Sequence, residues 1–182
     1  MRTWIDLDAL LDVRGFLSLR EEIEEGVANA ERVEHPQNGT YIPIFDVNEA
    51  AKAYFPSEDD WHPNYKLFPG LIAFAQRMPF TALSRIIILP GKTAPHRDWD
   101  DDTTQLLDQF IWAQLGDKRL FVEPDGRPRE YVTSTFAFFD GNHIHGAEDP
   151  TPGAISVRVD GVFTEEFKRL AGIAGLPFRT MR

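Results

Sequence analysis

The pattern of hydrophobic and polar positions changes character near the middle of the chain. Over residues 15–30, apolar side chains recur at partly helical spacing with acidic residues between them, which predicts an amphipathic helix. Residues 71–77 predict another helix, and Asp46 is placed to cap a helical segment over 47–54. Apart from a short extended stretch at 41–45, the first third of the chain is predicted to be mainly helical.

From Ser84 onward, short β-branched and aromatic runs alternate with glycine and proline turns, which predicts strands. The predicted strands cover 85–89, 93–98, 109–115, 119–122, 131–139 and 154–163. Gly116-Asp117-Lys118 predicts a hairpin turn between two of them, and Thr164 is placed to cap a C-terminal helix. Six or seven short strands separated by such turns predict an all-β barrel or sandwich.

Composition narrows the class of protein. The chain has 182 residues, of which 42% are hydrophobic, enough for one domain with a sizeable core. It contains no cysteine, which excludes disulfides, thiolate catalysis and cysteine-ligated metal centres. No apolar run resembles a signal peptide or approaches the roughly 20 residues of a membrane span, so we expect a cytoplasmic protein.

The charge balance indicates which partners to expect. The formal net charge is −10 and the pI is about 4.9, whereas duplex nucleic acid normally binds a basic face. The two close basic clusters, Lys118 with Arg119 and Arg127 with Arg129, are most simply interpreted as solvated loop charges. The acidic balance favours a neutral or cationic small-molecule or peptidyl substrate over nucleic acid or membrane.

The main candidate site is built from His96, Asp98 and His145. On an extended strand, residues i and i+2 point to the same face, so His96 and Asp98 can reach one point in space. Two imidazoles and one carboxylate, with coordination positions left open, are the ligand set of non-haem Fe(II) oxygenases. The alternative is a chance surface pair, but the turn at 90–91 and the later histidine and arginine favour the metal site.

Other side chains compete for roles beside this site. His143 lies two residues before His145; we prefer His145 as the ligand because Gly146 leaves room beside it. His143 would then have one of three roles. It contacts the substrate, it contacts one of the residues that bind the metal, or it is simply an exposed loop histidine. Trp112 is a further candidate for such a contact, although strand aromatics usually pack in the core. We expect two histidines in proline-containing loops, at 35 and 62, to face solvent.

Arg158 and Ser156 share one face of a predicted strand. A guanidinium binds a carboxylate through paired, charge-assisted hydrogen bonds, so this face could hold an acidic cosubstrate. The alternative is an arginine paired with a nearby acid such as Asp160. The acidic run 100–102 lacks the glycine and glutamate of a calcium loop and is interpreted as a solvated loop at the pocket mouth.

Four segments resemble the aspartyl/asparaginyl β-hydroxylase family of Fe(II)/2-oxoglutarate dioxygenases. They are Ile86-Ile87-Ile88-Leu89-Pro90-Gly91, Pro95-His96-Arg97-Asp98, Phe139-Asp140 followed by His145, and Ser156-Val157-Arg158-Val159. The resemblance spans about 85–163, under half of the chain. It implies a mainly β fold with flanking helices, a double-stranded β-helix of the jelly-roll, cupin-like type. The expected organisation is a single dioxygenase domain over 1–182, with a helical part about 1–80, a β-helix core about 84–163 and a C-terminal helix about 164–174.

The resemblance also implies an activity. Fe(II) would be held by His96, Asp98 and His145, and 2-oxoglutarate and O₂ would be the cosubstrates. The distal carboxylate of 2-oxoglutarate would meet Arg158, assisted by Ser156. The family's second basic pair for the cosubstrate is missing, and Gln105 or Gln109 lies near where it would fall. The reaction would hydroxylate an unactivated C–H bond of an amino acid, a small metabolite or a peptidyl side chain, with succinate and CO₂ as co-products.

Two other functions remain open from the sequence. A cupin-like metal-dependent isomerase or hydrolase would use the same ligands without 2-oxoglutarate, and Arg158 would then bind a substrate carboxylate or phosphate. A non-enzymatic binding module would show no stabilisation by divalent metal.

Overall fold

The computed structural model describes residues 3–35, 39–47, 57–98 and 106–179, and in these it contains eleven strands and four α-helices. The strands are β1 (Trp4–Asp6), β2 (Val33–His35), β3 (Gly39–Asp46), β4 (Phe80–Pro90), β5 (Thr93–His96), β6 (Phe110–Leu115), β7 (Leu120–Glu123), β8 (Glu130–Tyr131), β9 (Phe136–Phe139), β10 (Ile144–Ala147) and β11 (Ile155–Phe163). The helices are α1 (Val13–Leu17), α2 (Arg20–Asn29), α3 (Pro69–Ala75) and α4 (Glu165–Leu170), with 3-10 turns η2 (Glu58–Asp60) and η3 (Pro63–Leu67).

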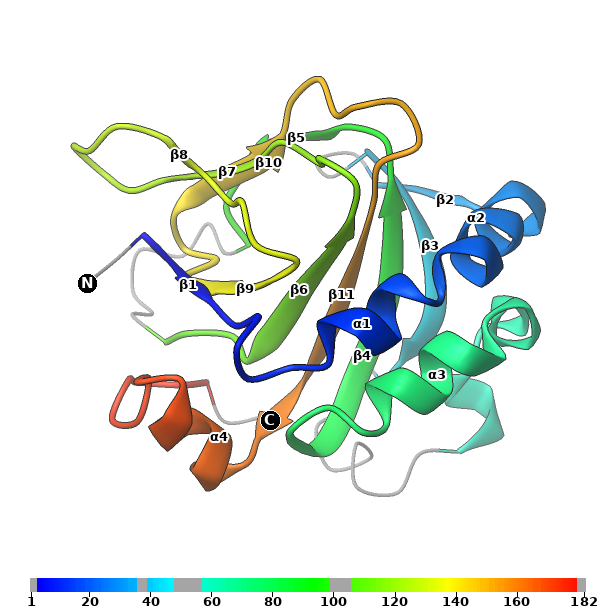
Figure 1. The fold of residues 1–182 in the computed structure, drawn as a ribbon, viewed down its shortest axis with the longest axis horizontal. Helices are drawn as coiled ribbons and strands as arrows, with labels where there is room; N and C mark the ends of the chain where they lie inside the picture. Colours follow the sequence, from blue (N-terminus) through cyan, green and yellow to red (C-terminus); the bar gives the residue numbers. More distant parts are fainter. Residues whose placement is uncertain (1–2, 36–38, 48–56, 99–105, 180–182) are drawn as a thin grey trace.

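Two antiparallel sheets form the centre of the molecule (Figure 1). The larger has the strand order β1-β9-β6-β11-β4-β3-β2, and the smaller has the order β5-β10-β7-β8. From β4 to β11 the chain passes back and forth between the sheets, so that β11 lies between β4 and β6 while β10 lies between β5 and β7. Eight strands wound in this way form a double-stranded β-helix, which confirms the expected fold class.

Strand β11 shows how the sequence separates the two faces of the larger sheet. Val157 and Val159 belong to the core that also contains the buried side chains of the helices. Ser156 and Arg158 alternate with them and face the space between the sheets, where Arg158 lies over the ring of Phe110. The polar residues of β11 therefore point into the barrel, and its apolar residues pack in the core beneath the helices.

Helices α1 and α3 cover the outer face of the larger sheet (Figure 1). Phe16 of α1 and Phe74 of α3 both pack on Phe136 of β9, with ring centroids 5.2 and 6.1 Å away. These helices bury one side of the sheet and leave the other side to form a cavity against the smaller sheet.

The prediction of a mainly helical first third was wrong in part. It contains α1, α2 and α3, and β3 confirms the extended stretch expected at 41–45, but the two edge strands of the larger sheet, β1 and β2, were not predicted. Both have only three residues, too few to show a period, and the partner of β1 is β9, more than a hundred residues away. The helix expected over 15–30 is divided into α1 and α2, and the one expected over 47–54 lies almost wholly outside the described residues.

Two predictions about local connections were also wrong. The turn at 116–118 does not close a hairpin, because β6 belongs to the larger sheet and β7 to the smaller one. Gly116 and Arg119 both have positive φ, 76° and 51°, and turn the chain across the barrel. The strand expected over 131–139 is likewise split between the sheets, into β8 and β9.

The C-terminal helix agrees with its prediction. The hydroxyl of Thr164 accepts a hydrogen bond from the amide of Phe167 and so caps α4. Among the described residues, no helix combines the length and the apolar character needed to cross a membrane.

Candidate metal centre

The three predicted metal ligands meet at the ends of two neighbouring strands. His96 is the last residue of β5 and is paired in register with His145 of β10. Asp98 follows two residues later and is fixed by a 2.9 Å hydrogen bond from its amide to the carbonyl of Gly141. Strand pairing thus joins His96 to His145, although 48 residues lie between them.

The distances within the group suit a single cation. One ligand atom from each of the three side chains lies within 4.8 Å of the other two. The Nε2 atoms of His96 and His145 are 3.7 and 3.4 Å from Oδ1 of Asp98. His145 is buried, and the side chains of His96 and Asp98 are only 11% exposed.

Backbone carbonyl groups fix the tautomer of both histidines. Nδ1 of His96 is 2.7 Å from the carbonyl of Ala94, and Nδ1 of His145 is 2.9 Å from that of His143. A carbonyl only accepts, so each Nδ1 carries the proton and, in the neutral ring, Nε2 carries the lone pair. Two nitrogen lone pairs then face a carboxylate oxygen, an arrangement that a cation stabilises. The donor set therefore fits a divalent metal.

Asp98 divides its two oxygens between different partners. Oδ1 faces the histidines, and Oδ2 accepts a 2.8 Å hydrogen bond from Nη1 of Arg158. Burial alone would raise the pKa of Asp98, but the charge of Arg158 and the close contacts of His145 and His96 outweigh it and hold that pKa well below its ordinary value. Asp98 is thus held ionised, with Oδ1 placed where it could bind a metal.

Arg158 is held in a cluster of opposite charges. Its Nε and Nη2 atoms lie 3.0 and 2.9 Å from Oδ1 of Asp160, and its Nη2 lies 3.8 Å from Asp108. Arg85 also pairs with Asp160, at 3.1 Å. The pairing with Asp160 that the sequence left as an alternative is therefore present. Burial would lower the pKa of Arg158, but Asp160, Asp98 and Asp108 raise it, so its charge is fixed.

A cavity of about 270 Å³ opens beside the three ligands. It is lined by His35, Arg85, Ile87, Leu89, Thr93, His96, Arg97, Asp98, Asp108, Trp112, Leu120, His145, Gly146 and Arg158. Two buried donors that line it, the hydroxyl of Thr93 and the indole nitrogen of Trp112, have no hydrogen-bond partner among the described residues. Because unpaired buried donors are costly, their presence fits a cavity that receives a ligand with acceptor oxygens.

The remaining predicted site residues lie at various distances from this cavity. Trp112 lines it, whereas the hydroxyl of Ser156 faces the carbonyl of Leu89, 3.4 Å away. Gln109 is used elsewhere: its amide donates to the carbonyl of Arg179 and accepts from the amide of Phe163. His143 does not line the cavity, and its Nε2 lies 3.9 Å from Asp140.

Sequence reasoning missed two residues that line the cavity and one buried lysine. His35 is exposed, as expected, but it lies on the edge strand β2 rather than in a loop, and it lines the cavity. Thr93 was not singled out at all. Lys118 was interpreted as a solvated loop charge, but it is fully buried. A lysine in a Gly-Asp-Lys turn carries no signal of burial, because only the crossing of the two sheets places it inside.

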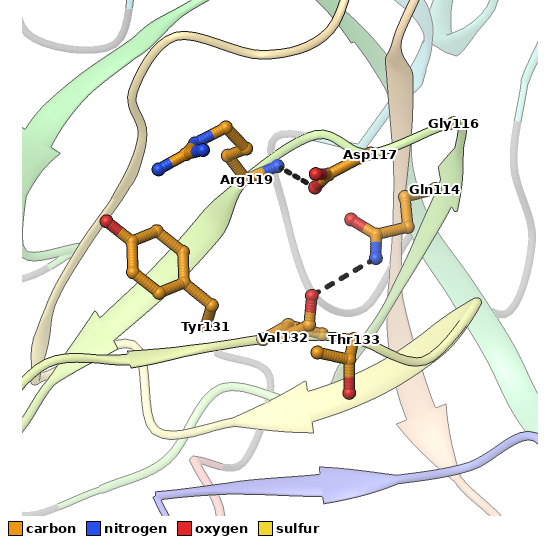
Figure 2. Close-up of a pocket in the computed structure, with 7 residues that line it drawn as sticks. All are labelled: Gln114, Gly116, Asp117, Arg119, Tyr131, Val132 and Thr133. Atoms are coloured by element: carbon orange, nitrogen blue, oxygen red, sulfur yellow. Dashed lines mark hydrogen bonds between the residues drawn. The ribbon is translucent and has the colours of Figure 1, made fainter.

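A second cavity, of about 430 Å³, lies between the β6–β7 connection and the segment after β8 (Figure 2). Gln114, Asp117, Arg119 and Tyr131 are among its lining residues, and it shares none with the cavity at the metal ligands. Figure 2 shows the amide nitrogen of Gln114 directed at the carbonyl of Val132, 3.4 Å away. Unlike the cavity at the metal ligands, it has no histidine among its described lining residues.

Comparisons with known proteins give weak likenesses. No protein-family model and no curated protein matches the chain. Among solved structures, an oxidoreductase of the 2OG-Fe(II) oxygenase family from Burkholderia pseudomallei is 16% identical, with a TM-score of 0.47, and the match covers 78% of this chain and 76% of that one. The non-heme alpha ketoglutarate dependent epimerase SnoN from nogalamycin biosynthesis is also 16% identical, with a TM-score of 0.40, and covers 99% of this chain and 88% of its own. The proposed function therefore rests on the geometry of the site and on the sequence, and these likenesses carry no part of it.

Proposed function

We propose that the protein is an Fe(II)/2-oxoglutarate-dependent dioxygenase that hydroxylates an unactivated C–H bond of an amino acid, a small metabolite or a peptidyl side chain. One observation carries the proposal: two imidazole nitrogens and one carboxylate oxygen converge beside a cavity in a double-stranded β-helix. Three protein ligands leave coordination positions open for a cosubstrate and O₂.

The chain's own residues hold and shape this centre. His96, Asp98 and His145 would bind the metal, and Arg158 would keep Asp98 in place as a ligand through one oxygen. Bound Fe(II) supplies the activation of O₂, coupled to the conversion of 2-oxoglutarate to succinate and CO₂. Ile87, Leu89 and Leu120 give the cavity apolar walls that limit water.

The finer parts of the proposal concern family and substrate. Resemblance of the four sequence segments supports an enzyme similar to the aspartyl/asparaginyl β-hydroxylases. The net charge of −10 supports a small or peptidyl substrate in preference to nucleic acid, and a cytoplasmic location remains part of the proposal.

The test combines turnover with binding. Purified protein is incubated with Fe(II), ascorbate, 2-oxoglutarate and a panel of amino acids and short peptides, and succinate and oxygenated products are measured. We expect succinate to rise with one substrate class in the wild-type protein and not in His145→Ala. The absence of both succinate and 2-oxoglutarate binding would exclude the proposal. Turnover that is independent of 2-oxoglutarate would instead support the isomerase or hydrolase.

A further inference from the structure

The cavity of about 430 Å³ beside the β6–β7 connection contains a buried acceptor without a partner. Gln114 of β6 lines this cavity and is only 7% exposed. Its amide nitrogen donates to the carbonyls of Val132, at 3.4 Å, and Ser134, at 2.8 Å. Carbonyl oxygens only accept, so the nitrogen and the oxygen of this amide cannot exchange places. The amide oxygen is thus held in position, and among the described residues it has no hydrogen-bond partner.

This unpaired oxygen is directed into the cavity. Figure 2 shows it pointing away from Val132, toward the space between Asp117 and Tyr131. A buried acceptor without a hydrogen bond costs about 1–3 kcal/mol. The two hydrogen bonds of the nitrogen explain why an amide is present, but they leave the oxygen unsatisfied. A ligand that brings an N–H group into the cavity would satisfy it.

Asp117 places a carboxylate on the same side of the cavity as this oxygen (Figure 2). Its Oδ1 accepts a 2.9 Å hydrogen bond from the amide of Arg119. Its main-chain carbonyl accepts from the amide and the hydroxyl of Thr151, both at 3.0 Å. The loop that carries Asp117 is therefore fixed before any ligand arrives, and this side of the cavity presents acceptors.

The opposite side of the cavity presents donors. Figure 2 shows the side chains of Arg119 and Tyr131 there, across the space from Gln114. The guanidinium of Arg119 lies over the ring of Tyr131, 5.3 Å from its centroid. Both residues are exposed, so a guanidinium and a phenol can be reached from solvent.

The two sides together define the chemistry of a suitable ligand. A guanidinium binds a carboxylate, and the oxygens of Gln114 and Asp117 accept hydrogen bonds from an ammonium. A simple anion would leave Gln114 unsatisfied and would face Asp117, whereas a simple cation would face Arg119. A molecule with an ammonium at one end and a carboxylate at the other meets both sides. A cavity of about 430 Å³ is also within the usual size range of small-molecule sites.

We propose that this cavity is a second ligand site, which binds the zwitterion of a small amino acid. The ammonium lies at Gln114 and Asp117, and the carboxylate lies at Arg119 and Tyr131. The cavity shares no lining residue with the one at the metal ligands, so the proposal goes beyond the proposed function and does not depend on it.

Ligand-observed NMR on the full-length protein tests the site without turnover. The probes are glycine, β-alanine, γ-aminobutyrate and δ-aminovalerate, in which the distance between the two charges increases stepwise. Butylammonium and butyrate carry one charge each. We expect at least one zwitterion to bind about tenfold or more tightly than either singly charged probe.

Variants locate the binding. Arg119→Gln and Gln114→Met should each weaken the best zwitterion about tenfold. Arg119 is exposed, so its variant gives a result even where Gln114→Met, which loses two hydrogen bonds, does not fold. Arg77→Gln is the matched control, because Arg77 is an exposed arginine over the ring of Phe74 and does not line this cavity. It should leave the affinity unchanged, as should His145→Ala.

Three results would overturn the proposal. Absence of binding by the wild-type protein would mean that solvent alone fills the cavity. Binding that His145→Ala abolishes and Arg119→Gln does not would place the amino acid at the metal ligands. Equal affinity for a zwitterion and for butylammonium or butyrate would show that only one side of the cavity recognises a ligand. All three would leave the dioxygenase proposal standing, because it rests on other residues.

Discussion

At the scale of single residues, main-chain carbonyl groups and one arginine decide what the metal ligands can do. The carbonyls of Ala94 and His143 fix the proton on Nδ1 of His96 and His145. Arg158 takes one oxygen of Asp98 and leaves the other for a metal. These contacts orient the ligands before any metal arrives, which lowers the cost of binding one.

Replacement of Arg158 tests this orienting role. In Arg158→Gln the carboxylate of Asp98 loses its charged partner, so we expect Mn(II) affinity to fall about 10- to 100-fold. Calorimetric titration with Mn(II) measures the change, and circular dichroism checks the fold. Arg129→Gln, which breaks ion pairs to Glu123 and Glu148 away from the cavity, is the matched control. A folded Arg158→Gln protein with wild-type Mn(II) affinity would contradict the orienting role.

Lys118 makes stability depend on pH. Its pKa is about 7 when folded and 10.5 when exposed, so the unfolded chain binds one more proton between these values. Wild-type stability should therefore rise with pH above 7 by about 1 kcal/mol per unit relative to Lys118→Met. Below pH 7 the difference in unfolding free energy between the two proteins is constant, and Lys118→Met is then most stable relative to wild type.

Urea unfolding of both proteins at pH 6.5 and 8.5 measures this dependence, with Lys92→Met as the control. A stability difference between wild type and Lys118→Met that stays the same at both values would show that Lys118 keeps an ordinary pKa inside the fold.

At the scale of elements, close approach of segments shapes the site. Gly146 of β10 faces strand β5, and a Cβ there would lie 2.9 Å from the carbonyl of Thr93. The room that the sequence suggested beside the metal is thus needed for the neighbouring strand. Gly141, in the connection between β9 and β10, packs against Asp98, and a Cβ there would lie 2.4 Å from Oδ2.

Gly141→Ala should disturb the metal site more than the fold. The added methyl group displaces the carboxylate of Asp98, whose side chain can move, so we expect Mn(II) affinity to fall by about tenfold or more with little loss of stability. Gly126→Ala is the contrasting control, since Gly126 has open space around it but a φ of 68°. It should cost about 1 kcal/mol of stability and leave Mn(II) affinity unchanged. Thermal unfolding measures the stability of both variants, and metal titration measures their Mn(II) affinity. If Gly141→Ala lost stability but kept its Mn(II) affinity, contact with Asp98 would not be the reason for glycine at 141.

At the scale of the whole molecule, the metal centre joins parts of the chain that are distant in sequence. Strands β5 and β10 of the smaller sheet supply the histidines, while Arg158 comes from β11 in the larger sheet. A cation bound here would join β5 to β10 in the smaller sheet, and the pair of Asp98 with Arg158 would link it to the larger sheet. Metal occupancy should therefore influence the stability of the entire fold.

Removal of metal should lower the melting temperature. A ligand at 100 times its Kd stabilises the folded state by about 2.7 kcal/mol, which is about 5–10 °C for a chain of this size. Differential scanning fluorimetry with EDTA and then with excess Mn(II) measures the shift, and His145→Ala should show none. An equal shift in wild type and His145→Ala would place the metal elsewhere.

The sequence by itself determined the candidate metal-binding residue types, the alternating faces of the strands after residue 84 and the capped C-terminal helix, because these depend on neighbours along the chain. Only the tertiary structure decided which sheet each strand joined, that β1 pairs with β9, and that Lys118 is buried. The pairing of Arg158 with Asp98 joins residues 60 positions apart. Such contacts follow from the winding of the two sheets, since charge pairing and burial depend on distance in space, and no local pattern encodes that distance.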